Sequence, residues 1–173
     1  MVAEILVGTS GFVYDHWRGG FYPEKLAKAK WLEFYVTHFT TVELNNSFYR
    51  LPSETNFATW RDSTSDNFTF ALMVSRFITH IKRLKNTEEA VETFTTRAKI
   101  LGNKLGPLLY QLPPNMHRND EVLASFLSGL PQGMKHVFEF WHQSWLEEKV
   151  FEILHKYNIG FCAFDMPSPS EDN

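Results

Sequence analysis

The chain has 173 residues, a net charge of −3 at pH 7, and 21% charged residues. This length allows one domain with a sizeable core, and the lack of a basic excess argues against nucleic-acid binding driven by overall charge. No segment approaches the roughly 20 apolar residues of a membrane span and no signal peptide is visible, so we expect a cytoplasmic protein without membrane contact.

Short apolar segments with the pattern of strands alternate along the chain with longer segments of helical period. The predicted strands are Ala3–Gly8, Thr41–Asn45, Phe68–Val74, Pro107–Leu112, His136–Phe140 and Ile159–Phe164. The predicted helices are Pro23–His38, Ser53–Asp62, Thr87–Gly102, Asp120–Leu130 with Asp120 as its cap, and Ser144–Tyr157. Repeated alternation of this kind predicts parallel βαβ units with right-handed crossovers.

The predicted fold class is α/β, a parallel barrel of the TIM type formed as a single domain over residues 1–173. A closed (β/α)₈ barrel typically needs ~250 residues, so about six of its eight strands are expected here. Neither an internal repeat nor an interdomain linker interrupts the pattern. We expect the first and last strands to have unpaired edges, which favours self-association.

The segment Thr41–Ser53 carries the strongest functional signal in the sequence. In its strand, apolar residues alternate with Glu43 and Asn45, which therefore share one face. Burying an unpaired carboxylate costs several kcal/mol, so such residues are kept where a partner, water or a ligand meets them. A polar and aromatic loop with Tyr49 and Arg50 follows, as at a catalytic strand end of an α/β barrel.

The same alternation predicts which side chains of the other strands point into the barrel. It assigns inward positions to Met73, Gln111, Glu139 and Trp141, and to Phe161, Ala163 and Asp165 in the last strand. The predicted catalytic residues are Glu43, Glu139, Asp165 and His142. The predicted substrate-binding residues are Ser10, Asn45, Tyr49, Arg50, Arg76, His80 and Gln111.

The chemistry of this set leaves alternatives open. Three convergent carboxylates beside a histidine suit a divalent metal with oxygen ligands. They equally suit an acid/base pair in which proximity raises one pKa and leaves the other carboxylate ionised. Arg50 has the geometry to bind a phosphate or carboxylate, but it is equally placed to neutralise Glu43.

Several longer motifs occur in order along the chain: GTSGF, FYP, TVELNNSFYRLPS, SRFITHIKRL, KLGPLLYQLPPN and EFWHQSW. Together they resemble the YecE-like family, the domain of unknown function seventy-two, over essentially the whole chain. The resemblance implies a TIM-barrel-like fold with a cluster of polar residues at the carboxyl ends of the strands. It implies no established activity.

The chain departs from the family pattern at three places. Family members usually carry Lys where this chain has Met73 and Arg where it has Trp141. They also continue past the C-terminal D-x-P with two further strands, including a Y-x-R-x-H-G segment. The resemblance therefore adds a structural alternative, in which Glu43 and Glu139 once formed ion pairs with that Lys and Arg and served only to stabilise the barrel.

Three functional hypotheses are compatible with the sequence. The first is an enzyme, or an enzyme relic, with hydrolase- or isomerase-like chemistry on a phosphorylated or sugar-like substrate, assisted by a divalent metal or by acid/base groups alone. The second is a non-catalytic module that binds nucleic acid or a protein partner through the basic segment Arg76–Lys85. The third is a remnant without a competent site.

Overall fold

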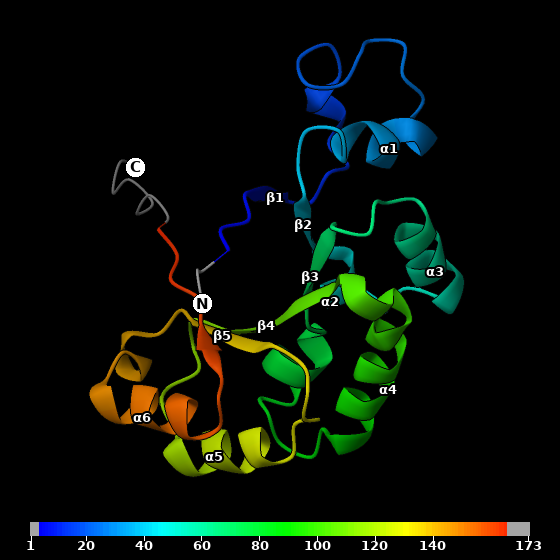
Figure 1. Ribbon diagram of the computed structural model, residues 1–173. Coiled ribbons are helices and arrows are strands. Elements are labelled where there is room, and N and C mark those ends of the chain that lie inside the picture. Colours follow the sequence, from blue (N-terminus) through cyan, green and yellow to red (C-terminus); the bar gives the residue numbers. More distant parts are fainter. Residues whose placement is uncertain (1–3, 166–173) are drawn as a thin grey trace, which may run out of the picture.

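The computed structural model describes residues 4–165 as an α/β fold built on a six-stranded parallel sheet (Figure 1). The strands follow chain order, from β1 to β6, and each pairs in parallel with the next. They are β1 (Gly8–Ser10), β2 (Thr41–Leu44), β3 (Thr69–Met73), β4 (Leu105–Leu112), β5 (His136–Phe140) and β6 (Gly160–Phe161). The sheet is not closed, because β1 and β6 do not pair with each other within the described part.

Helices connect the strands as the alternation predicted. They are α1 (Trp31–Tyr35), α2 (Asn46–Tyr49), α3 (Glu54–Asp62), α4 (Glu88–Ala98), α5 (Asp120–Ser128) and α6 (Glu148–Lys156). Short 3₁₀ turns cover Asp15–Trp17, Lys28–Lys30, Lys99–Lys104 and Gln143–Trp145, and a π-helical turn covers Phe77–Ile81. In Figure 1, α4, α5 and α6 follow one another along the outer side of the sheet.

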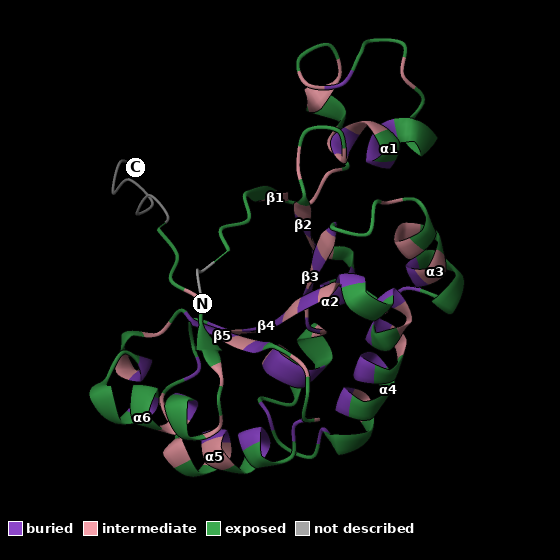
Figure 2. Ribbon diagram, viewed as in Figure 1, coloured by how far each residue is buried: buried purple, intermediate pink, exposed green. Residues whose placement is uncertain are grey.

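The core lies between the sheet and these outer helices, where Figure 2 shows the buried positions. In β3, Phe70 and Leu72 are fully buried, whereas Ala71 and Met73 are only partly so. Successive side chains of a strand point to opposite faces, so the apolar set packs outward on the helices. The other set faces the inner, open side of the sheet, where the predicted site residues lie.

The boundaries of β1 and β6 differ from the prediction. The predicted strand Ala3–Gly8 is shifted, since β1 begins at Gly8, where pairing with Thr41 starts, and Ala3 lies outside the described residues. Gly8 allows this approach, because a Cβ there would lie 2.2 Å from the carbonyl oxygen of Thr41. The predicted strand Ile159–Phe164 shortens to two paired residues.

The first predicted helix is also wrong in length. Of Pro23–His38, only α1 forms α-helix, preceded by a 3₁₀ turn over Lys28–Lys30. Tyr22 stacks on Trp31 with ring centroids 4.4 Å apart, and both rings are buried. Aromatic packing of this kind overrides local helix preference, because large rings dominate the energetics of a small core.

The cap of α5 is Asn119 rather than the predicted Asp120. The Asn119 side chain accepts a hydrogen bond from the backbone N–H of Val122 at 3.0 Å. Asp120 instead accepts hydrogen bonds from Arg118 at 2.6 and 2.8 Å, and these hold the pKa of its carboxyl at about 2. Both residues suit the start of a helix, and the extended backbone of Asn119 decides which one caps it.

Candidate functional site

The inner face of the sheet brings Glu43 and Glu139 together from β2 and β5. Ser10, at the end of β1, pairs with Glu43 in register and donates a hydrogen bond from its Oγ to Glu43 Oε1 at 2.8 Å. Asn45 Nδ2 donates in turn to Ser10 Oγ at 2.7 Å. The chain from Asn45 through Ser10 to Glu43 fixes one oxygen of this carboxyl in place.

The electrostatics of Glu43 favour its protonated form. Burial raises the pKa of the Glu43 carboxyl above its ordinary value of 4.5, and the negative charge of Glu139 raises it further. The hydrogen bond from Ser10 acts in the opposite direction but does not cancel these effects. Glu43 therefore binds a proton more readily than an ordinary glutamate does.

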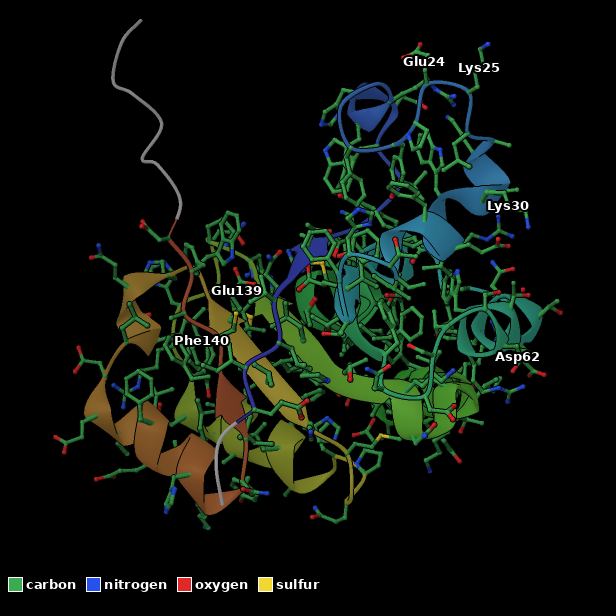
Figure 3. The ribbon with its side chains drawn as sticks, turned by 45° about the horizontal axis from the view of Figure 1, so that its top comes forward. Glu24, Lys25, Lys30, Asp62, Glu139 and Phe140 are labelled. Carbon is green, nitrogen blue, oxygen red and sulfur yellow. The ribbon has the colours of Figure 1, made fainter. Side chains whose placement is uncertain are left out.

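Glu139 is the more deeply buried member of the pair, with 6% of its surface exposed. It accepts hydrogen bonds from the indole Nε1 of Trp141 at 2.7 Å and from Gln111 Nε2 at 3.2 Å. Its position on β5, the strand next to the edge strand β6, is marked in Figure 3. Both oxygens thus receive N–H donors, and Trp141 supplies a neutral donor where the resemblance led us to expect an arginine.

The register of β6 reverses the predicted inward set of the last strand. Gly160 pairs with Val137 and Phe161 with Phe138, so Phe161 lies on the helix side and contacts the ring of Phe151 at 5.1 Å. Period two then turns Cys162 inward. Burial raises the pKa of the Cys162 thiol, and the negative charges of Glu139 and Glu43 raise it further.

Asp165 and His142 do not join the pair as predicted. Asp165 is exposed, and it has no hydrogen bond or ion pair among residues 4–165. His142 caps the 3₁₀ turn Gln143–Trp145, where its Nδ1 accepts from the backbone N–H of Ser144 at 3.1 Å. Its ring lies 4.0 Å from that of His117, centroid to centroid. The prediction for Asp165 depended on alternation, which a short strand end does not maintain.

The described residues contain no group of three or more His, Cys, Asp or Glu side chains arranged to hold a metal ion. The predicted convergence of Glu43, Glu139 and Asp165 on a divalent metal is therefore not supported. One polar atom of the site lacks a partner in the described part of the chain: Asn45 Oδ1 is buried there without a hydrogen bond. A buried acceptor of this kind is costly unless a ligand or water meets it.

The predicted anion-binding residues lie on the loops after β2 and β3. Phe48 contacts the ring of His80 at 4.9 Å, which ties these two loops together. Burial and the charge of Arg76 lower the pKa of His80, so its neutral form is favoured. Tyr49, Arg50 and Arg76 are exposed, and none of them contacts Glu43 or Glu139 through a hydrogen bond or ion pair.

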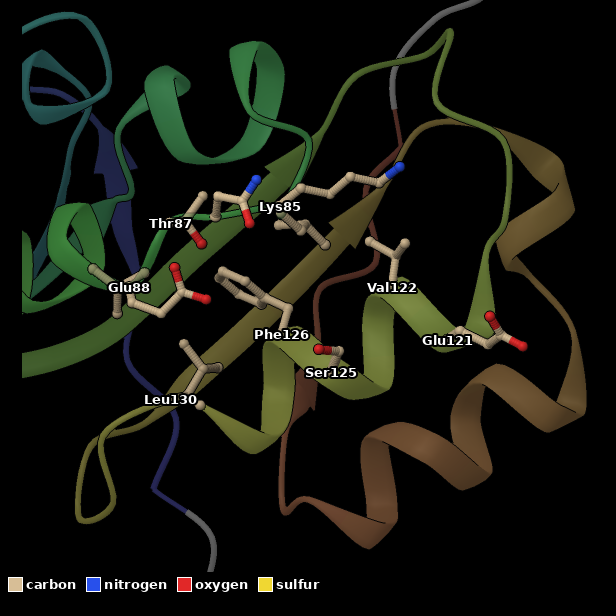
Figure 4. A pocket seen from close by; sticks show the side chains of 12 residues that line it. Lys85, Thr87, Glu88, Glu121, Val122, Ser125, Phe126 and Leu130 are labelled. Carbon is tan, nitrogen blue, oxygen red and sulfur yellow. The ribbon is translucent and has the colours of Figure 1, made fainter.

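Two cavities bear on where the active site lies. One, of about 280 Å³, lies on the inner face and is lined by Ser10 and Glu43 together with neighbouring residues of β1, β2 and β3. The other, of about 360 Å³, opens between the start of α4 and α5, with Val122, Phe126 and Leu130 on its wall (Figure 4). The first contains the predicted residues Ser10 and Glu43 and the second contains none, so we take the inner face as the candidate active site.

Sequence reasoning missed two residues of this site. Trp141 was expected to point inward but not to donate to Glu139, although a spacing of two along a strand puts both on one face. The apolar segment around Cys162 (IGFCAF) predicts a buried, inert thiol and gives no functional signal. The side chains near Cys162 depend on how β6 pairs with β5, and the apolar sequence around Cys162 does not predict that pairing.

The geometry can now be compared with known proteins. The family described as "Protein of unknown function DUF72" matches residues 6–173. This chain belongs to that family. It is 33% identical to the UPF0759 protein YecE of Escherichia coli K12 over 140 residues, which cover 78% of this chain and 52% of YecE. It is 29% identical to the UPF0759 protein YunF of Bacillus subtilis over 157 residues, 86% of this chain and 54% of YunF.

Solved structures of DUF72 proteins agree with this assignment. A member from Thermotoga maritima MSB8 superposes with a TM-score of 0.83 at 31% identity, covering 95% of this chain and 66% of that one. A member from Enterococcus faecalis V583 superposes with a TM-score of 0.70 at 18% identity, covering 88% and 57%. The chain thus spans about half the length of the curated relatives that it matches. Within residues 4–165, no helix is long and apolar enough to cross a membrane.

Proposed function

We propose that this DUF72 chain forms a single domain, the first six βα units of a TIM-barrel-like parallel barrel, with an acid–base site at the carboxyl ends of its strands. The sequential strand order and the outer layer of helices support the barrel. The observation that carries the site is the pair Glu43 and Glu139, whose proximity helps to raise the pKa of Glu43. Two carboxyls with different environments can divide the roles of proton donor and acceptor.

The substrate class follows from the groups around this pair. Asn45 and Gln111 contribute amides, and the orphaned Oδ1 of Asn45 can accept from a hydroxyl group. Trp141 stacks against Phe164 with ring centroids 5.4 Å apart, which gives the site an aromatic wall. Hydroxyl-binding amides beside an aromatic surface suit a sugar-like molecule. Because no Lys or Arg forms an ion pair with Glu43 or Glu139 in residues 4–165, a neutral sugar fits better than an anion.

The test is a panel of aldoses and aryl glycosides, assayed for binding by thermal shift and for turnover by NMR. A ligand at ~100 times its dissociation constant stabilises the fold by ~2.7 kcal/mol, a shift of roughly 5–11 °C at this size. We expect Glu43→Gln and Glu139→Gln each to lower turnover by at least about 100-fold, as loss of a general acid or base does. The exposed Glu33→Gln, paired with Lys30, is the matched control and keeps wild-type turnover.

Two results would contradict this proposal. One is turnover that survives both substitutions, since the carboxyls would then not be the acid and base. The other is a complete absence of binding and turnover across the panel, with a sharp melt that no sugar moves. That second result would favour the structural role of the carboxylates.

A second function has its own observation, on the segment Arg76–Lys85. Its basic side chains Arg76, Lys82, Arg83 and Lys85 are all exposed. Phe77 and Ile81, on the same turn, expose 44% and 60% of their surface. Basic and apolar groups side by side suit a nucleic-acid or protein partner. Oligonucleotide binding whose log affinity falls steeply with log salt would support this alternative.

A further inference from the structure

A cavity of about 490 Å³ lies at the start of α3, apart from the paired carboxylates. Its lining residues are Asn46, Arg50, Leu51, Pro52, Ser53, Asn56 and Arg97. None of these is a residue of the inner-face site. They come from α2, the turn before α3, the first turn of α3, and the end of α4. The cavity therefore collects side chains from three helices of the outer layer.

The lining of this cavity is cationic. Arg50 and Arg97 are its only ionisable side chains, and no carboxylate lines it. Arg97 is half-buried and held in place, since its Nη1 donates to the carbonyl of Pro52 at 3.0 Å. Neither arginine forms an ion pair within the described chain, and the Arg50 side chain makes no hydrogen bond there. Two guanidinium groups are thus available to one oxyanion, together with the amide side chains of Asn46 and Asn56.

A second cavity, of about 430 Å³, adjoins the first and shares Leu51 with it. Phe77, Ile78 and Phe94 form an apolar part of its wall. Lys82 and Glu89, one charge of each sign, also line it, so it has no net charge preference. The two cavities together offer a cationic end and an apolar end on either side of one leucine.

We propose that these adjoining cavities bind a small phosphate monoester whose body is apolar or aromatic. The phosphoryl oxygens accept hydrogen bonds from Arg50 and Arg97, while the organic group lies against Phe77 on the far side of Leu51. This site is distinct from the inner-face site proposed to bind a sugar-like molecule, so each proposal can be tested independently of the other. In this proposal Arg50 binds a phosphate instead of neutralising Glu43.

The experiment is calorimetric titration of the 173-residue chain at low ionic strength with inorganic phosphate and with phenyl phosphate. We expect both to bind, with phenyl phosphate several-fold tighter. Arg50→Gln and Arg97→Gln each weaken both ligands by about tenfold, the effect of removing one charge-assisted hydrogen-bonding group. Phe77→Ala weakens phenyl phosphate alone, because it removes the apolar wall and leaves both guanidinium groups intact.

Lys99→Gln is the matched control, because Lys99 is exposed, follows α4 two residues after Arg97, and lines neither cavity. It removes the same charge and should change either affinity less than twofold. Arg50→Gln keeps the test interpretable if Arg97→Gln unfolds, since the Arg50 side chain is exposed and forms no hydrogen bond or ion pair within residues 4–165. Equal losses in Lys99→Gln and Arg50→Gln would overturn the proposal, as would binding of oligonucleotides but not of either phosphate. Glu43→Gln should leave both affinities unchanged.

Discussion

At the scale of single residues, the environment of Glu43 decides its chemistry. The residue shares its face of the sheet with Glu139, and within residues 4–165 its carboxyl accepts a hydrogen bond only from the hydroxyl of Ser10. Desolvation and the neighbouring negative charge both disfavour ionisation. Glu139, by contrast, receives two N–H donors. The two carboxyls therefore differ in their hydrogen-bonding partners.

The raised pKa of Glu43 predicts a pH-dependent effect on stability. Its pKa is higher in the folded state than its ordinary 4.5, so between the two values the folded chain binds more protons than the unfolded chain. Stability contributed by this group therefore falls as pH rises through that window. We expect Glu43→Gln to melt at a higher temperature than the wild type at pH 7, with the difference vanishing near pH 4.5. Equal melting temperatures of Glu43→Gln and the wild type from pH 4.5 to pH 8 would contradict this prediction.

Comparing the melting temperatures of Glu43→Gln and the wild type separates the effect of Glu43 from the effects of other titrating groups. Burial lowers the pKa of His136, whose ring lies between the Tyr110 hydroxyl and the carbonyl of Pro131. That histidine destabilises the fold as pH falls below 6.5, in the opposite direction to Glu43. Since both proteins contain it, it cancels in the difference between their melting curves.

At the scale of elements, α3 depends on a residue far away in sequence. Lys104 is 5% exposed, and its Nζ donates to the carbonyls of Arg61 and Thr64 at 2.5 and 2.6 Å. These carbonyls lie at the C-terminal end of α3, where a helix leaves acceptors unsatisfied. The buried ammonium group of Lys104 is thus stabilised by carbonyl acceptors at the end of the helix. The carboxylate of Asp66 contributes less, since its Oδ1 lies 4.0 Å from Lys104 Nζ.

Removal of this ammonium should destabilise the protein. We expect Lys104→Met to lower the free energy of unfolding by about 2 kcal/mol, because it removes a buried donor from the carbonyls of Arg61 and Thr64 and leaves the Arg61 carbonyl only the longer hydrogen bond from the Thr64 hydroxyl, at 3.3 Å. Urea denaturation followed by circular dichroism measures the change. Lys99→Met serves as the control, since Lys99 is exposed on the same turn and should shift the free energy by less than about 0.5 kcal/mol. Equal effects of the two substitutions would rule out the capping role.

At the scale of the whole molecule, the sheet has two edges without a neighbouring strand in residues 4–165. Apolar side chains are exposed near both. Ile5 and Val7 precede β1 with 85% and 67% of their surface exposed, and Phe161 and Phe164 at the β6 end expose 40% and 44%. Unpaired backbone groups beside apolar side chains favour association with another chain.

We therefore expect the 173-residue chain to self-associate. Sedimentation velocity over a range of micromolar concentrations should show a concentration-dependent shift towards dimer. Val7→Lys and Phe164→Lys, which place a charge near each edge, should restore the monomer. Leu146→Lys, at a residue 50% exposed but outside the sheet, should leave association unchanged. A single monomeric species at every concentration would contradict the expectation.

Much of the fold was predictable because its strands and helices have strong local patterns. The strands Thr41–Leu44 and His136–Phe140 and the helix Glu54–Asp62 with its Ser53 cap lie within a residue of their predicted bounds. The helix after Pro23 was not predictable, since the stacking of Tyr22 on Trp31 outweighs helical periodicity. Locally determined elements were thus predicted well, and those shaped by distant contacts were not.

For the site, the sequence by itself determined that Glu43 and Asn45 share a face, that Glu139 and Gln111 share it too, and that the chain resembles DUF72 proteins. Side-chain alternation is a local property, so one strand is enough to read it. Only the tertiary structure decided that Cys162 rather than Asp165 faces the carboxylates, that His142 caps a turn, and that Arg50 lines a cavity with Arg97. Each of these depends on register or on packing between elements distant in sequence, and neither is encoded in the local pattern.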